Sequence, residues 1–333
     1  MTVSLALRNS REVSAATRRK IHRLAAHAGY TPDPAITRLM HHLRLRAPAR
    51  FKTTIHGIGE RFSSEQISRG NYGDRLHSGL QLRCAALGFT YERLFLDDFS
   101  SGSQLARVLL SRGVEGLVIL PLRKSSDLTD LLDWTRFATV AATPAVQAPL
   151  FHSAMPNHFD NMMALCQNLR REGCERIGVA IPEDWNRRVK YRWAGGIAWQ
   201  NLFGETKPIR PLFTHAPGPN LDSEEFSDWL EREKPDAVIT DSTHQSALTP
   251  GLSRLPPRAR PKIVTMNWPD GEADAGIDQR GEQIGAAAVD LLAGMLTRGE
   301  LGVPEVPRTT MVEGVWVGGT FSSATNPPPS VNA

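Results

Sequence analysis

Short β-rich runs alternate with helix-length segments through most of this 333-residue chain, and this alternation limits what it can fold into. Alternating strands and helices favour parallel sheets that are joined by right-handed helical crossovers. The sequence therefore predicts an α/β body with more than one compact unit. We expect strands at 89–96, 114–120, 139–142, 177–181, 237–241, 263–267 and 310–317, and helices at 72–86, 104–112, 159–171, 188–202, 223–233 and 282–297.

Composition excludes several classes of protein. No apolar run approaches the roughly 20 residues that span a bilayer, and the first residues lack the apolar region of a secretion signal. Cys84, Cys166 and Cys174 are too few for a disulfide framework, and no His/Cys spacing resembles a zinc site. We therefore expect a cytoplasmic protein with no membrane span, no metal and no cofactor.

Charge is divided unevenly along the chain. The first 50 residues hold ten arginine and lysine residues and two acidic residues, whereas the rest holds 29 basic and 33 acidic residues. A small basic segment on a mildly acidic body favours a polyanionic partner for that segment alone. The alternative is a solvated arm that happens to be basic.

The basic segment carries helix signals. Ser14 can cap a helix, and Gly29 with Pro32 can end it. The apolar residues at 21, 24, 25 and 28 would share one face of that helix. A further short helix is expected from Asp33-Pro34 to about residue 44, followed by a basic linker.

Three ordered blocks in this segment share a pattern with a known family. They are Thr2-Val3-Ser4-Leu5-Ala6-Leu7-Arg8-Asn9-Ser10, Val13-Ser14-Ala15-Ala16-Thr17-Arg18-Arg19 and Ala28-Gly29-Tyr30-Thr31-Pro32-Asp33-Pro34. Together they resemble the headpiece of the lactose-repressor (LacI/GalR) family of transcription regulators. The resemblance implies an all-α helix-turn-helix headpiece over 1–46, with a hinge helix at about 34–44. It also implies an α/β, two-lobed, type I periplasmic-binding-protein-like body over 51–321, and we expect a disordered tail at 322–333.

The family headpiece has a first helix and a turn that would lie upstream of Met1, so this helix is missing from the sequence. Either the true start lies upstream of Met1 or the headpiece is incomplete. A helix-turn-helix needs its first helix to brace the second across the DNA backbone. We therefore expect weak DNA binding by the 333-residue chain and strong binding by a chain extended upstream.

The resemblance places Met1, Thr2 and Leu5 at the start of the recognition helix, which meets base edges in the major groove. Leu5 lies where many family members have arginine. Leucine can contact a thymine methyl group but cannot make the bidentate contact that reads guanine. The operator is therefore expected to differ from the common family sequence.

Other residues of the segment would contact the DNA elsewhere. Ser4, Asn9 and Thr17 are candidates for phosphate contacts, which set position and not sequence. Leu39 matches the hinge-helix leucine that wedges into the minor groove and kinks the duplex. The alternatives are ordinary surface polar residues and, for Leu39, packing on protein.

The body is expected to form two lobes, the first over about 51–143 and 280–305 and the second over about 150–268 and 308–321. In open α/β sheets small molecules bind beyond the carboxyl ends of the strands, here in a cleft between lobes. Trp185, Asp241 and Trp268 follow strand ends. Arg192 matches a position where family members often keep an arginine that contacts the effector. The alternative is that the tryptophans are core and the charges are surface pairs.

These observations predict a nucleoid-associated regulator, acting as a repressor, that binds a palindromic DNA operator as a homodimer. A small-molecule effector, a sugar or a related metabolite, would control it. The sequence holds no Walker motif, nucleophile elbow or metal pair on a helix, so we expect no enzyme and no catalytic residues. The alternative is a small-molecule binding protein of the same fold with lost or impaired DNA binding.

Overall fold

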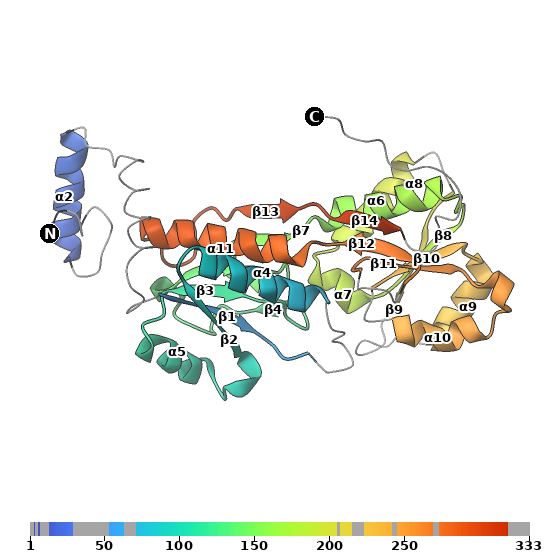
Figure 1. The fold of residues 1–333 in the computed structure, drawn as a ribbon, viewed down its shortest axis with the longest axis horizontal. Coiled ribbons are helices and arrows are strands. Elements are labelled where there is room, and N and C mark those ends of the chain that lie inside the picture. The colour runs from blue at the N-terminus through green and yellow to red at the C-terminus, as the bar shows by residue number, and fades with distance from the viewer. Residues whose placement is uncertain are drawn as a thin grey trace.

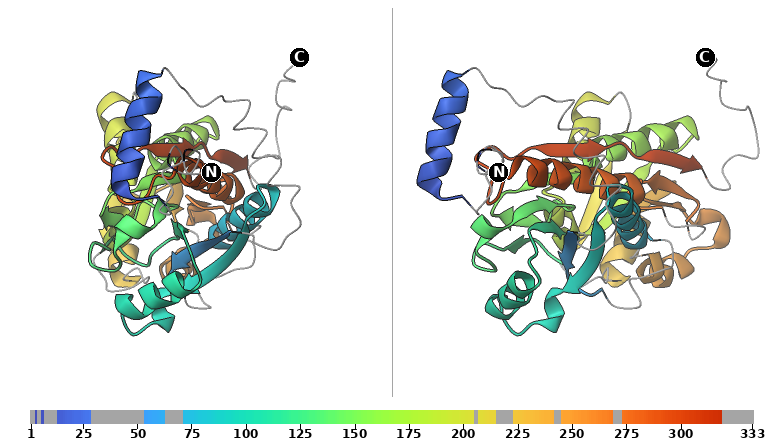
Figure 2. Two further views of the ribbon diagram at one scale, coloured as in Figure 1. Left: turned by 90° about the vertical axis from the view of Figure 1, so that its left-hand side faces the viewer. Right: turned by 60° about the vertical axis from the view of Figure 1, so that its left-hand side comes forward.

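The computed structural model describes residues 3, 6, 13–28, 53–62, 71–204, 207–214, 223–241, 245–268 and 273–318. Figure 1 shows a body of two α/β lobes side by side, with the helix α2 (Ala15–His27) at the end next to the first lobe. The right-hand view in Figure 2 shows α2 standing apart from both sheets. The predicted two-lobed α/β body is confirmed.

The first lobe is a parallel sheet with helices on both faces. Its strands run in the order β13-β7-β5-β3-β1-β2. The helices α4 (Tyr72–Ala86) and α11 (Gly281–Arg298) cover one face, and α5 (Gly102–Ser111) covers the other. Burial on both faces explains why its central strands read as continuous apolar runs. The strands are β1 (Thr54–Gly59), β2 (Thr90–Phe95), β3 (Gly116–Ile119), β5 (Ala138–Ala141), β7 (His152–Pro156) and β13 (Thr309–Val312).

The second lobe has the same layered plan. Its strands run in the order β14-β12-β11-β10-β8-β9, and only β14 is antiparallel to its neighbour. The helices α6 (His158–Arg171), α7 (Glu183–Arg188) and α8 (Arg192–Phe203) lie over one face, and α9 (Ser223–Glu233) and α10 (Gln245–Ser253) over the other. The strands are β8 (Ile177–Pro182), β9 (Arg210–Thr214), β10 (Ala237–Thr240), β11 (Lys262–Thr265), β12 (Ala275–Asp278) and β14 (Val315–Gly318). A small separate sheet pairs β4 (Ser126–Asp127) with β6 (Val146–Ala148).

The chain passes between the lobes at three places, from β7 to α6, from β12 to α11 and from β13 to β14. Hydrogen bonds tie the first passage to the third. The Asn157 side-chain amide donates to Glu313 at 2.8 Å, and the Gly314 backbone N–H donates to the Asn161 side chain at 2.9 Å. A Cβ atom at Gly314 would overlap Ile277, so only glycine fits where these passages meet.

The second passage is held by one arginine of the first lobe. Arg75 on α4 binds both carboxylate oxygens of Asp278 at 2.7 and 3.0 Å, and its Nε donates to Glu282 at 2.8 Å. The hydrogen bonds to Glu282 are the main reason that the pKa of Arg75 lies above its ordinary value. Paired, partly buried charges of this kind fix the direction of the chain from β12 into α11.

The structure differs from the expected lobe boundaries. β7 and β13 belong to the first lobe, although both were assigned to the second, and β12 adds to the second lobe a strand that was not expected. The expected strand at 310–317 is two strands, which pair in different sheets on either side of Glu313-Gly314. Sheet membership depends on which distant strands pair, and a local apolar pattern does not specify this. The expected tail at 322–333 lies outside the described residues.

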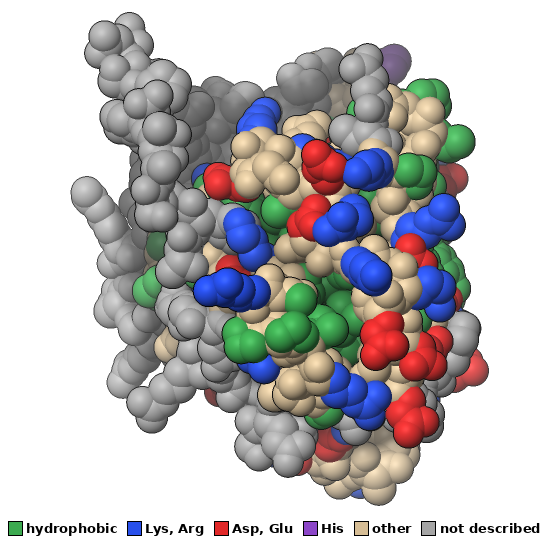
Figure 3. Space-filling model, turned by 90° about the vertical axis from the view of Figure 1, so that its right-hand side faces the viewer, with side chains coloured by type: hydrophobic (Ala, Val, Ile, Leu, Met, Phe, Trp, Pro, Cys, Tyr) green, Lys and Arg blue, Asp and Glu red, His purple; other side chains and the backbone are tan. Residues whose placement is uncertain are grey.

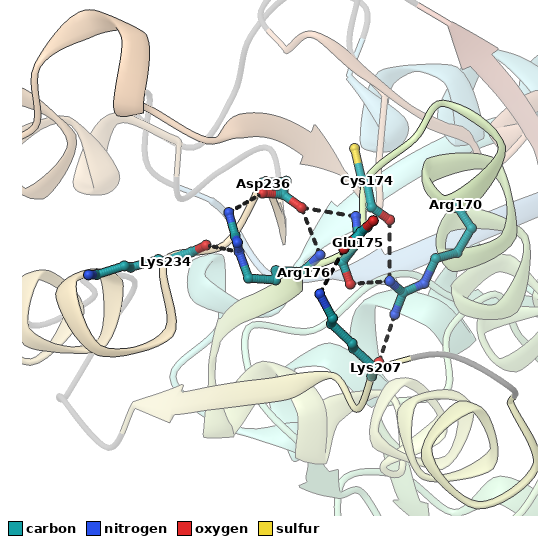
Figure 4. A network of polar contacts seen from close by, with 7 residues as sticks. All are labelled: Arg170, Cys174, Glu175, Arg176, Lys207, Lys234 and Asp236. Atoms are coloured by element: carbon teal, nitrogen blue, oxygen red, sulfur yellow. Dashed lines mark hydrogen bonds and ion pairs between the residues drawn. The ribbon is translucent and has the colours of Figure 1, made fainter.

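A cluster of charged residues closes the amino ends of β8 and β10 (Figure 4). The Asp236 carboxylate accepts hydrogen bonds from the backbone N–H groups of Glu175 at 2.9 Å and Arg176 at 2.8 Å, and from the Arg176 guanidinium at 2.6 Å. Burial alone would raise the pKa of Asp236, but these N–H groups and the Arg176 charge hold it below its ordinary value. We call Arg170, Glu175, Arg176, Lys207 and Asp236 the amino-end cluster.

The remaining cations of the amino-end cluster also have partners. Lys207 pairs with Glu175 at 2.7 Å. Arg170 donates to the backbone carbonyls of Cys174, Glu175 and Lys207. Every cation in this cluster therefore meets a carboxylate or a set of carbonyl oxygens.

Candidate functional site

The four predicted ligand-contacting residues lie near the carboxyl ends of the strands of the second lobe. Trp185 is on α7, directly after β8, and Asp241 directly follows β10. Trp268 lies three residues beyond β11, and Arg192 begins α8. In a parallel sheet these ends share one edge, so the fold gathers the four residues at the side of the lobe that meets the first lobe. We call this region the interlobe site.

The structure adds Arg188, which the sequence reasoning missed, to the interlobe site. Its guanidinium carbon lies 3.7 Å from the centre of the Trp185 ring, and its Nη1 donates to the backbone carbonyl of Leu122 in the first lobe at 3.3 Å. Asp241 and Tyr72 interact with its charge from the second and the first lobe. Arg188 is thus a direct link between the lobes. Its neighbour Arg187 is also basic, and nothing in the local pattern shows which of the two turns inward.

Burial acts strongly on the charge of Arg188. It lowers the pKa of this side chain to about 10, although the negative charge of Asp241 opposes the shift. Burial also lowers the pKa of Arg192 and raises that of Tyr72. A desolvated guanidinium is costly unless an anion or several acceptors surround it.

A strained turn between α7 and α8 positions these arginines. Lys190 and Tyr191 are consecutive non-glycine residues with φ of 55° and 57°, in the left-handed region that side chains disfavour. Asn186 is buried and holds the turn, because its carbonyl accepts from the Tyr191 N–H at 2.9 Å and its side chain from the Ala194 N–H at 3.4 Å. The turn interrupts the single helix expected at 188–202. Strain of this kind concentrates at functional sites.

His158, at the start of α6, lies close to the same charges. It is buried and packs edge-on against Trp193, with ring centres 5.4 Å apart. Burial, followed by the charges of Arg192 and Arg188, lowers its pKa to about 3. The imidazole is therefore neutral at pH 7, and its Nδ1 atom has no hydrogen-bond partner among the residues that the structure describes.

The two tryptophans serve partly as core and partly as surface. Trp185 packs against the core of the second lobe while Arg188 covers its ring. Trp268 is half-buried, donates its backbone N–H to Ile277 at 2.8 Å and lies against Gly276. The alternative of core tryptophans thus holds in part, and both rings keep exposed surface. Whether Arg192, Asp241, Trp185 and Trp268 contact a ligand stays a prediction.

The predicted DNA-contacting residues fall mostly outside the described part of the chain; this applies to Met1, Thr2, Ser4, Leu5, Asn9, Leu39 and the hinge helix at 34–44. Thr17 is described. It is exposed on the first turn of α2, and its hydroxyl lies 2.8 Å from that of the N-cap Ser14. This confirms Ser14 as the helix cap. The basic side chains Arg19, Lys20 and Arg23 are exposed on the same helix.

Within the described residues, no group of three His, Cys, Asp or Glu side chains can hold a metal ion. Nor is any described helix long and apolar enough to cross a membrane. A cavity of about 520 Å³ lies away from the interlobe site, between β9 and α9 on the outer side of the second lobe. Figure 3 shows the outer end of this lobe, where a hydrophobic patch lies among basic and acidic side chains.

Comparisons with known proteins concern both the N-terminal segment and the two-lobed body. Residues 1–33 match the family described as bacterial regulatory proteins, lacI family. A search of curated proteins finds no match. Among solved structures, the chain is similar to a complex of the transcriptional regulator CelR with cellobiose, with a TM-score of 0.58 and 17% identity over 95% of this chain and 94% of that one.

Two further structures share the fold. A lac repressor dimer bound to operator and the anti-inducer ONPF has a TM-score of 0.53 and 19% identity, over 95% of this chain and 93% of that one. The Cra transcriptional dual regulator from Pseudomonas putida in complex with fructose 1-phosphate has a TM-score of 0.57 and 18% identity, over 80% of this chain and 98% of that one. The body thus has the fold of LacI-type regulators.

Proposed function

We propose that this chain, a LacI-family regulator by its N-terminal match and its fold, binds double-stranded DNA through its first 46 residues and senses a small molecule at the interlobe site. The match at residues 1–33 carries the proposal, since it occurs in the same chain as a two-lobed body. The exposed basic side chains of α2 support it, because phosphate contacts come mainly from arginine and lysine. The proposed activity is binding and not catalysis, in the cytoplasm at the nucleoid.

We also propose that the protein acts as a homodimer on a two-fold-symmetric operator and represses transcription. A helix-turn-helix reads one half-site, and two copies related by a two-fold axis read a palindrome. The similar lac repressor structure is a dimer bound to operator, which supports this arrangement.

The proposed effector is a polyhydroxylated metabolite such as a sugar or a sugar derivative. The similar structures with cellobiose and fructose 1-phosphate support this class. In the interlobe site the exposed ring surface of Trp268 suits stacking on a sugar ring, and Asp241 and Arg192 suit hydrogen bonds to hydroxyl groups. Arg188 already joins the lobes through Leu122. A ligand bound there would change how the lobes meet, with an expected coupling to DNA affinity of about 1–3 kcal/mol.

Genomic fragment selection tests the DNA-binding proposal. The protein is incubated with sheared DNA from its own genome, and retained fragments are sequenced and measured by gel retardation between 50 and 200 mM salt. We expect a shared palindrome and steep weakening with salt, because cationic contacts release counterions. The double variant Arg19→Gln/Lys20→Gln is expected to weaken retention of all sequences.

Arg171→Gln is the matched control, since this arginine is exposed at the far end of α6 and its loss is expected to leave retention unchanged. Failure of the protein, and of a version extended upstream of Met1, to retain any duplex contradicts the proposal. Ligand-induced stabilisation without DNA retention would instead support a small-molecule binding protein of the same fold.

A further inference from the structure

Basic side chains gather at the turn between α7 and α8, where the described residues provide no carboxylate at ion-pair distance. Arg188, Lys190 and Arg192 lie at alternate positions across this turn. Among the described residues none of the three has a carboxylate oxygen within the 4.0 Å of an ion pair, whereas fourteen other such pairs occur in the body. Other described cations without an ion pair, such as Arg107 and Arg171, are exposed, whereas Arg188 and Arg192 are partly buried.

The hydrogen-bonding capacity of the two arginines is largely unused. A guanidinium carries five N–H donors. Toward the described residues, Arg188 makes one hydrogen bond, to the Leu122 carbonyl at 3.3 Å, and Arg192 makes one, to the Val189 carbonyl at 3.2 Å. Both side chains are partly buried, so water has limited access to their N–H groups and cannot fully replace a protein acceptor. The remaining donors are available to a ligand.

The surroundings of the turn reinforce this excess of positive charge. The charges of Arg192 and Arg188 reach the buried His158, and the charge of Arg192 lowers the pKa of Lys190 in addition to burial. Asp241 is the described acidic group that acts on Arg188. Glu183 and Asp184 lie at the opposite end of α7, and Asp184 is directed to Arg187 at 3.8 Å. Among the described residues, Arg188 is thus influenced by one carboxylate, and burial alone lowers the pKa of Arg192.

From this arrangement we propose that the effector at the interlobe site is an anion, held through a phosphate or carboxylate group by Arg188 and Arg192. The proposal rests on the function proposed above and narrows its ligand class. Oxyanions match the guanidinium fork in a bidentate way, and such charge-assisted bonds are stronger than bonds to neutral hydroxyl groups. Because Arg188 also contacts Leu122 of the first lobe, an anion bound to it lies where the two lobes meet.

Calorimetric titration of the full chain with inorganic phosphate at constant ionic strength tests the proposal. Glucose 6-phosphate and glucose are then titrated as a pair that differs only in the phosphate group, and gluconate is titrated as a ligand with a carboxylate. Phosphate is expected to bind the unaltered protein and to change its tryptophan fluorescence, because Arg188 covers the Trp185 ring. Arg188→Gln and Arg192→Gln are each expected to weaken this binding about 10–100-fold, as for loss of a hydrogen bond to a charged group. Arg171→Gln, at an exposed site on α6, is the charge-matched control and should leave the affinity unchanged.

Thermal unfolding without ligand shows whether each variant folds. Equal phosphate affinity in the unaltered protein and in folded Arg188→Gln overturns the proposal, as does binding of glucose at least as tight as glucose 6-phosphate. Gluconate binding without phosphate binding would assign the carboxylate form. DNA retention separates the two proposals. If the protein binds the anion but retains no DNA, the anion site stands and the proposed DNA-binding regulator is wrong. If glucose alone releases DNA, the regulator stands and the anionic effector is wrong.

Discussion

The two ends of the second lobe's sheet both gather basic side chains, but among the described residues only the amino end provides them with carboxylates at ion-pair distance. At the amino ends of β8 and β10, Arg176 and Lys207 meet Asp236 and Glu175 at 2.6 and 2.7 Å (Figure 4). At the carboxyl ends, Arg188 meets an aromatic ring and one carbonyl. Ion pairs that close a sheet serve folding, whereas desolvated cations with few acceptors lower stability and are consistent with a binding role.

The largest loss of stability that this comparison predicts is for a substitution of Asp236. Asp236→Ala removes an acceptor from two backbone N–H groups and one guanidinium at once. Groups that lose a partner in a partly buried place each cost free energy, so we expect the free energy of unfolding to fall by about 3 kcal/mol. Urea denaturation at pH 7 measures this loss.

Asp290→Ala provides the matched control for Asp236. Asp290 accepts from Arg83 alone, at 2.7 Å, and both side chains are exposed. An exposed pair of this kind contributes about 0.2–1 kcal/mol. If both alanine variants lose the same free energy, the amino-end cluster is not the structural anchor that its hydrogen bonds indicate.

The next largest effect concerns pH and His158. This histidine has a pKa of about 3 in the fold, below its ordinary value of 6.5, so the unfolded chain takes up its proton first as the pH falls. Stability is therefore highest above pH 6.5 and declines as the pH falls toward 3, by about 1.4 kcal/mol per unit, or about 2 kcal/mol at pH 5. Urea denaturation at pH 7 and pH 5 measures the decline.

His158→Phe keeps an aromatic ring against Trp193 and removes the titrating group. The variant is expected to lose about 2 kcal/mol less between pH 7 and pH 5 than the unaltered protein. His56, His77 and His152 also have lowered pKa values, but they contribute equally in both proteins. Identical declines would show that His158 is not held neutral, and hence that the carboxyl end is less positive than described.

Sequence reasoning predicted the parts of the fold that local pattern decides. The helices at 72–86 and 223–233 have the expected bounds, and the buried strands β3, β8 and β10 lie where continuous apolar runs indicate. β1 and β12 were missed because Thr-Ile-His-Gly-Ile-Gly and Ala-Gly-Ile-Asp interrupt their apolar residues with glycine or polar residues and so form no continuous apolar run. α10 was missed because Pro250 and Gly251 within it read as turn signals.

The site was predictable only in part for the same reason. Strand ends placed Trp185 and Asp241 correctly at one edge, because parallel strands bring their carboxyl ends together. Arg188 could not be found, since its importance comes from Leu122, 66 residues away in the chain, and from a left-handed turn at Lys190. Long-range contacts and backbone conformation leave no local apolar pattern.

The smallest expected effect gives the most direct test of the difference between the two ends of the second lobe's sheet, because the same substitution, arginine to methionine, is made at each end. Arg176→Met removes a guanidinium that binds Asp236 at 2.6 Å and the Lys234 carbonyl at 2.6 Å. Arg188→Met removes a desolvated charge that has no carboxylate of the described residues within ion-pair distance, and methionine can still pack on the Trp185 ring.

We expect Arg176→Met to lower the free energy of unfolding by about 1 kcal/mol, because its pair is half-exposed. We expect Arg188→Met to leave this free energy within about 0.5 kcal/mol or to raise it, because the cost of burying the charge disappears with the charge. Both values come from urea denaturation of the ligand-free protein in one buffer. A loss for Arg188→Met as large as that for Arg176→Met would mean that the contact of Arg188 with Leu122 stabilises the fold as much as the Arg176–Asp236 pair does, and the two ends of the sheet would then not differ in kind.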